Sequence, residues 1–123
     1  MQGQWFPFLA TSLLMLGCGA SYPVPTQPLA DTESAERSAI ELGAANQPKA
    51  QLHLQLAHEQ LSRAKDAIQN GENEKATALL SRARADAELA IALTREEAAK
   101  TGAQNATDQS NTQKATNARQ GGQ

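Results

Sequence analysis

Apolar residues recur along two stretches of the chain at alternating spacings of four and three. From about residue 48 to 70 the recurring residues are Ala50, Leu54, Ala57, Leu61, Ala64 and Ile68. From about 72 to 98 they are Ala76, Leu80, Ala83, Ala87, Ala90 and Thr94, with Leu79 and Ile91 beside them. Such heptad seams are typical of helices that bury one side against another helix. Each stretch is therefore predicted to be one amphipathic helix.

The dipeptide Asn70-Gly71 separates the two stretches, and glycine tolerates the left-handed conformation that ends many helices. Two seams of equal length joined by so short a turn predict an antiparallel helical hairpin and an all-α fold class. Pro48 suits the first turn of the first hairpin helix. Because most seam positions are alanine, the helices can approach closely but bury little area. The hairpin alone is expected to be only marginally stable.

A shorter helix is predicted before the hairpin, over about residues 32–44. Asp31 or Thr32 is expected to cap its N-terminus. Its narrow apolar stripe consists of Ala35, Ala39 and Leu42. Leu52 and Leu56 form a second stripe on the following helix, and we expect this stripe to receive the short helix.

Two segments flanking this helical domain (residues 31–100) are expected to be disordered. Residues 18–30 contain the run SYPVPTQP, which is typical of an extended, semi-rigid tether. Residues 101–123 consist almost wholly of Gln, Asn, Thr, Ala and Gly. A segment so low in apolar residues cannot form a core, so it is predicted to be a disordered polar tail.

The single cysteine, Cys18, follows an apolar run from Phe6 to Leu16. This run is too short to cross a bilayer as a helix, which needs about 20 residues, but it suits the core of a signal peptide. With Gly17 before the cysteine, the segment resembles the bacterial lipoprotein signal. It departs from that signal because Leu16 stands where a small residue is usual, Met15 stands where Leu is usual, and no Lys or Arg precedes the run. The resemblance implies that residues 1–17 are a signal peptide, cleaved between Gly17 and Cys18, and that Cys18 carries palmitate and other acyl chains.

The residue after Cys18 indicates where a lipoprotein is sorted in bacteria with two membranes. This residue is Gly19 and not Asp, so the resemblance implies that the protein is sorted to the outer membrane and faces the periplasm. Three acyl chains are enough for stable anchoring. The alternative is that Cys18 is an ordinary thiol near the N-terminus.

The helical part also resembles the bacterial lipoprotein family known as domain of unknown function 4398, over about residues 30–98. The resemblance rests on Pro48, Leu52, Leu61, Ala64, Ala67, Gly71, Ala76, Leu79, Ala83 and the run ADAELA at 85–90. The turn and the helix after it are also similar to a single tetratricopeptide-repeat hairpin, but stacked repeats need about three copies. The family has no established activity, so the resemblance implies architecture and location and no particular chemistry.

Catalytic and metal-binding motifs are missing from the sequence. His53 and His58, the two histidines, lie about 140° apart around a helix, so they are not expected to share a metal and are predicted to be solvated. The sequence contains neither a nucleophile-elbow serine nor a glycine-rich phosphate loop. We therefore predict no catalytic residue, no cofactor, no metal and no small-molecule substrate.

Charge is balanced along the chain, with a net charge of −2 at pH 7. Neither sign dominates, so nucleic acid is not an expected partner. Arg82 and Arg84 are expected to be offset by Asp86 and Glu88, which lie four residues further along the helix.

These observations predict a non-enzymatic cell-envelope lipoprotein. Its membrane-anchored helices would act as a docking or spacing module for another envelope component. The alternative is an envelope protein that self-assembles as a coiled coil through the helical seams. A ligand-binding protein is a less favoured third reading.

Overall fold

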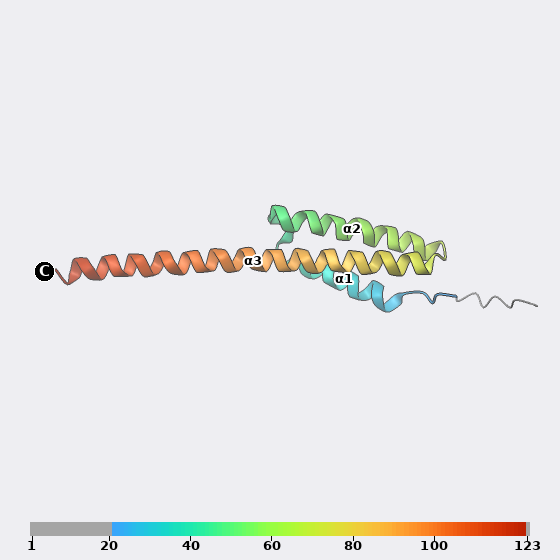
Figure 1. Cartoon of the computed structure of the whole chain (residues 1–123), viewed down its shortest axis with the longest axis horizontal. Coiled ribbons are helices and arrows are strands. Elements are labelled where there is room, and N and C mark those ends of the chain that lie inside the picture. Colours follow the sequence, from blue (N-terminus) through green and yellow to red (C-terminus); the bar gives the residue numbers. More distant parts are fainter. Residues whose placement is uncertain (1–20, 123) are drawn as a thin grey trace, which may run out of the picture.

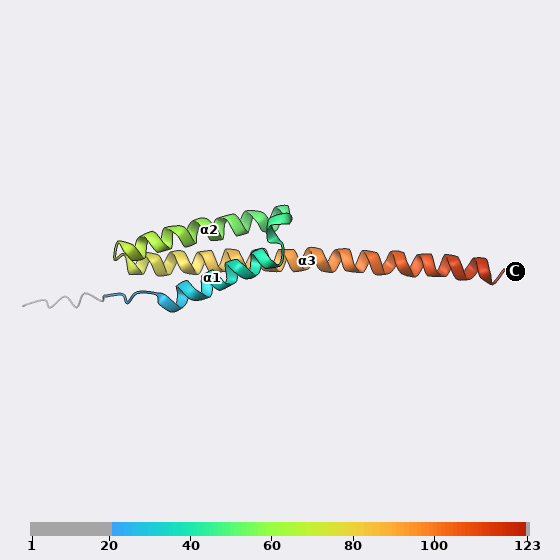
Figure 2. The ribbon, with the colours of Figure 1, turned by 180° about the vertical axis from the view of Figure 1, so that it is seen from behind.

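The computed structural model of the protein describes residues 21–122. Within them the chain forms helix α1 (Thr26–Glu41), a short 3-10 helix η1 (Ala44–Asn46), helix α2 (Pro48–Gln69) and helix α3 (Asn73–Gln120). Helices α1, α2 and the first half of α3 lie side by side as a three-helix bundle, and the rest of α3 extends beyond it alone (Figure 1; Figure 2). The all-α class and the hairpin of α2 and α3 are confirmed.

The turn between α2 and α3 closes as its dipeptide predicts. Gly71 has φ = 75°, in the left-handed region. The Gly71 N–H donates to the Ile68 carbonyl at 3.0 Å, and the Glu72 N–H donates to the Ala67 carbonyl at 2.8 Å. This paired arrangement is a Schellman motif, which satisfies carbonyls that the end of a helix would otherwise leave without partners. It reverses the chain within a few residues and so sets α3 antiparallel to α2.

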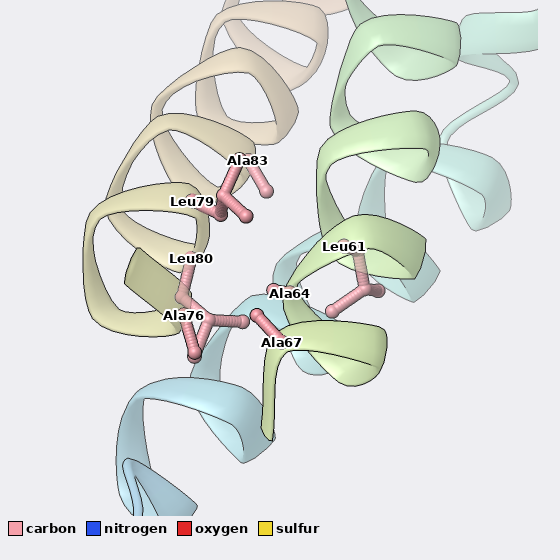
Figure 3. Close-up of a cluster of buried hydrophobic side chains, with 7 residues drawn as sticks. All are labelled: Leu61, Ala64, Ala67, Ala76, Leu79, Leu80 and Ala83. Atoms are coloured by element: carbon pink, nitrogen blue, oxygen red, sulfur yellow. The ribbon is translucent and has the colours of Figure 1, made fainter. Parts of the chain in front are cut away.

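The facing seams of α2 and α3 form the core. All six predicted seam residues of α3 are buried, from Ala76 to Thr94. In α2 the alanines and Leu61 are buried, while Leu54 and Ile68 are half-buried. Figure 3 shows the cluster near the turn, where side chains of the two helices face one another: Leu61, Ala64, Ala67, Ala76, Leu79, Leu80 and Ala83. The predicted periodicity therefore matches the packing.

Helix α1 begins earlier than predicted, at Thr26 and not near residue 32. Pro28 was interpreted as part of an extended tether, but it occupies the first helical turn. A proline is tolerated there because its missing N–H would have no partner within the helix. The first backbone bond runs from the Leu29 N–H to the Pro25 carbonyl at 3.1 Å. Of the predicted disordered linker, residues 26–30 are thus helical and residues 18–20 lie outside the described residues.

Thr32 was predicted as a possible cap, but it lies inside α1 and is almost fully buried. Its Oγ1 contacts the Pro28 carbonyl of its own helix at 2.7 Å and the Leu80 carbonyl of α3 at 3.3 Å. A hydroxyl this close to another helix's backbone requires small neighbouring side chains. Helix α1 therefore packs closely on α3.

The expectation that Leu52 and Leu56 receive α1 was wrong. These side chains are 55% and 37% exposed, and α1 lies in the groove on the other side of the hairpin. Three polar contacts mark that groove: Glu33 pairs with Lys65 at 2.8 Å, Glu36 contacts His58 at 2.7 Å, and Asp31 pairs with Arg84 at 3.4 Å. Leu42, predicted in the buried stripe of this helix, is 44% exposed because α1 ends just before it.

The second half of α3 also differs from the prediction of a disordered tail from residue 101. The helix continues to Gln120, and every residue from 95 to 122 is exposed; we call residues 95–120 the α3 arm. The composition indicates the absence of a core, but a helix that is already nucleated lengthens at little cost per residue. The Gln104–Asp108 hydrogen bond at 3.0 Å spans one turn of the arm. Gly102 is the one glycine within it, and Gly121 and Gly122 follow its end.

We predict that Leu80→Ala strongly destabilises the bundle. Leu80 is fully buried, and truncation of a buried leucine costs about 2–5 kcal/mol in the free energy of unfolding. Urea unfolding followed by circular dichroism measures this. Leu42→Ala is the matched control, because the same change at an exposed leucine is expected to cost about 0.5 kcal/mol or less. Equal losses in the two variants would contradict the packing described here.

We also predict fast amide hydrogen exchange in the α3 arm. Opening a turn there breaks backbone hydrogen bonds but no tertiary contacts, whereas opening α3 between Ala76 and Ala90 disrupts the core. Exchange read by mass spectrometry should be complete in residues 101–120 while residues 76–90 are still protected. Equal protection of the two segments would contradict an unsupported arm.

Candidate functional site

The predicted lipid-attachment residue, Cys18, and the predicted cleavage position after Gly17 lie outside the described residues. The described chain nevertheless places the segment that follows them. The Asn73 side-chain amide donates to the Tyr22 carbonyl at 2.9 Å, next to the turn between α2 and α3. The chain therefore enters at the turn end of the bundle, and the α3 arm leaves at the opposite end (Figure 1).

A polar cluster lies between α2 and α3 on the side of the hairpin away from α1. Asp86 is at its centre: one carboxylate oxygen contacts His53 Nδ1 at 2.9 Å, and the other accepts from Gln60 Nε2 at 2.6 Å. Gln60 Oε1 is buried and has no hydrogen-bond partner among the described residues. We call these three residues the Asp86 cluster. Sequence patterns could not reveal this cluster, because Gln60 and His53 lie 26 and 33 residues before Asp86 in the chain.

The second histidine, His58, is bound separately. Its Nδ1 lies 2.7 Å from Glu36 Oε1 of α1, on the other side of the hairpin from the Asp86 cluster. The prediction that both histidines are merely solvated was therefore incomplete, because each contacts a carboxylate of a neighbouring helix. Within residues 21–122 no group of three or more His, Cys, Asp or Glu side chains is placed to hold a metal ion.

The chemical capacity of the Asp86 cluster is limited. A carboxylate that orients a histidine can support general-base catalysis when the ring also reaches a nucleophile. Among the described residues no serine, threonine or cysteine hydrogen-bonds to His53 or His58. The geometry instead favours a structural role, in which a hydrogen-bonded polar group fixes the register of α2 against α3.

Arg84 and Arg82 differ in their partners. Arg84 pairs with Glu88 at 2.8 Å, as predicted, and this hydrogen bond is the main cause that raises the pKa of its guanidinium. Asp86 does not offset Arg82, because it binds His53 and Gln60 instead. Within the described part of the chain Arg82 has no ion-pair partner.

Exposed leucines neighbour the members of the Asp86 cluster along both helices. They are Leu52 and Leu56 of α2 and Leu89 of α3, which are exposed by 55%, 37% and 42% respectively. We call these three residues the leucine patch. Both His53 and Gln60 reach Asp86, and Leu56 lies between them along α2. Leu89 follows Asp86 by three residues, so the patch lies on this same side of the hairpin. Leu52 and Leu56 are one turn apart on α2, and exposed apolar residues that neighbour one another mark interaction surfaces.

None of the helices in residues 21–122 combines the length and the apolar character needed to span a bilayer. The hollows on the surface are shallow grooves. One lies between α1 and α2 and is lined by Glu36, Ile40, Leu54, Gln55, His58 and Glu59.

The fold and these surfaces define a small all-helical protein built on an alanine-rich hairpin. Comparison with known families agrees with this architecture and assigns the chain to a family. Residues 27–106, more than half of the chain, match the family model described as a domain of unknown function, DUF4398, and the chain belongs to that family. The match begins at the start of α1 and ends within the α3 arm. Neither a curated protein nor a solved structure was found to match the chain.

We predict that Asp86→Ala destabilises the protein by about 1–2 kcal/mol, because it leaves two donors in a half-buried groove without their acceptor. Glu88→Ala is the matched control: its carboxylate is exposed, so its loss should cost about 0.5 kcal/mol or less. Urea unfolding of both variants measures the difference. If Asp86→Ala proves as stable as Glu88→Ala, the cluster contributes nothing to the bundle.

Proposed function

We propose that this protein is a non-enzymatic lipoprotein of the cell envelope, anchored through acyl chains on Cys18. On this proposal, residues 1–17 are removed as a signal peptide and the helical domain faces the periplasm from the outer membrane. The helices then serve as a docking or spacing module for another envelope component. The observation that carries the proposal is the apolar run that ends in Gly17-Cys18.

The course of the chain after the cysteine supports this proposal. Only a short segment separates Cys18 from Tyr22, whose carbonyl is held at the turn end of the bundle. An anchor at residue 18 would therefore hold the bundle close to the bilayer by that end. The α3 arm would start from the far end, and the last 20 residues of the arm, from 101 to 120, span about 30 Å. A rod with its tether at one end and a bare helix at the other has the shape of a spacer.

The exposed surfaces support a docking role more than a catalytic one. The leucine patch offers apolar area to a partner, whereas no nucleophile of the described residues hydrogen-bonds to either histidine–carboxylate pair. The seams of α2 and α3 are already buried against each other within one chain. A partner, or a second copy, would therefore use the outer faces of these helices.

We predict that the native protein carries fatty acid and that Cys18→Ser does not. Cells grown with a clickable palmitate analogue and expressing either protein test this, because Cys18 is the single thiol in the chain. Ser21→Ala is the matched control and should label like the wild type. Mass spectrometry of the mature N-terminus should find acylated Cys18 as the first residue. Equal labelling of wild type and Cys18→Ser, or an intact Met1, would contradict the anchor.

Docking is tested separately, in cells. A photo-crosslinking amino acid placed at Leu56 should capture another envelope protein or a second copy, whereas one placed at the exposed Ser34 of α1 should capture much less. A patch that captures no more than Ser34 does would contradict the docking role and leave the anchor unaffected.

A further inference from the structure

Helix α3 carries a second heptad stripe, on the side opposite its buried seam. Its residues again alternate in steps of four and three, and all of them are exposed: Ala78, Arg82, Ala85, Leu89, Ala92, Glu96, Ala99, Ala103, Ala106 and Ser110. The stripe is continuous from the bundle into the α3 arm. Small residues at heptad positions allow another helix to approach closely. None of residues 21–122 covers this face.

The charges on the stripe are arranged symmetrically about its leucine. Arg82 lies seven residues before Leu89 and Glu96 lies seven residues after it. Each charge is thus two helical turns, about 10 Å, from Leu89 along the axis. Arg82 has no ion-pair partner among the described residues, and Glu96 pairs only with the exposed Lys100. An exposed pair of that kind is weak and can be exchanged for another.

This symmetry favours a second copy of α3 as the partner of the stripe, and it favours the antiparallel direction for that copy. If a second α3 packs antiparallel with Leu89 opposite Leu89, each Arg82 faces the other chain's Glu96, which gives two equivalent ion pairs. A parallel arrangement would instead set Arg82 against Arg82 and Glu96 against Glu96. Surfaces that are self-complementary about a two-fold axis are the basis of symmetric dimers.

We propose that a second copy of this chain covers this face and forms an antiparallel α3–α3 dimer centred on Leu89. The paired segment from Ala78 to Lys100 is about 33 Å long. The interface uses outer faces only, so the core of each bundle is unchanged. This inference does not depend on the lipid anchor.

The dimer is expected to be weak and reversible. Alanine contributes little buried area, and specific interfaces at the small end bury about 1,200 Å² in total. Sedimentation equilibrium of the purified full chain under reducing conditions should show a monomer–dimer equilibrium. Its dissociation constant is expected to be on the order of 10 μM, near the weak end of specific association.

Charge reversal tests the pairing. Arg82→Glu or Glu96→Arg alone places two like-charged pairs in the interface and should weaken the dimer about tenfold or more. An equimolar mixture of these two variants restores opposite charges at both positions and should associate like the wild type. The double variant Arg82→Glu/Glu96→Arg should also associate like the wild type. Arg95→Glu, on another face of the same helix, is the control and should leave the dimer unchanged.

Cysteine crosslinking tests the direction. In a Cys18→Ser background, Ala85→Cys and Ala92→Cys lie nearly opposite one another across the antiparallel dimer. A mixture of the two variants should form an 85–92 disulfide readily, whereas each variant alone should form little. A protein that stays monomeric at 1 mM, charge reversals that neither the mixture nor the double variant rescues, or an 85–85 disulfide as the main product would each overturn the proposal.

Discussion

The close approach of α2 and α3, made possible by alanine, is the constraint on which this structure depends. Most of the buried apolar residues are alanine, and Leu80 and Thr32 are the largest side chains that are fully buried. Large side chains contribute little to the stability of such a core, and the close packing of the two helix backbones contributes much. That distance also lets α1 lie deep in the groove, where the Thr32 hydroxyl reaches a carbonyl of α3.

A core of similar small residues specifies the packing register poorly, because one alanine fits where another does. In this protein polar contacts supply what the core lacks. The Asp86 cluster joins α2 to α3 on one side of the hairpin, and the polar contacts of α1 join all three helices on the other. These contacts add little stability where they are exposed. They disfavour sliding of one helix along another, because a shift by one turn would separate several of them.

The two ends of the bundle differ, and this difference affects how an anchored dimer would lie relative to a membrane. The chain enters at the turn end, and the α3 arm leaves at the other end. An antiparallel pair would place the two entry points at opposite ends of the dimer. If both chains were anchored in one membrane, such a pair would lie along the bilayer surface, whereas a single anchored chain is free to stand away from it. Association would then change the reach of the arm.

The sequence by itself determined α2, α3 and the turn at Gly71, because periodicity and a left-handed glycine are properties of residues close together in the chain. It also indicated that residues 101–120 pack on nothing. It could not indicate that they stay helical, since that depends on a helix nucleated within the bundle. The groove that α1 occupies follows from long-range packing, because Thr32 binds a carbonyl 48 residues away. Packing also explains why Asp86 binds His53 and Gln60, which leaves Arg82 available on the outer face. Local spacing favours Arg82 as the partner of Asp86, but the folded bundle brings the two distant side chains closer.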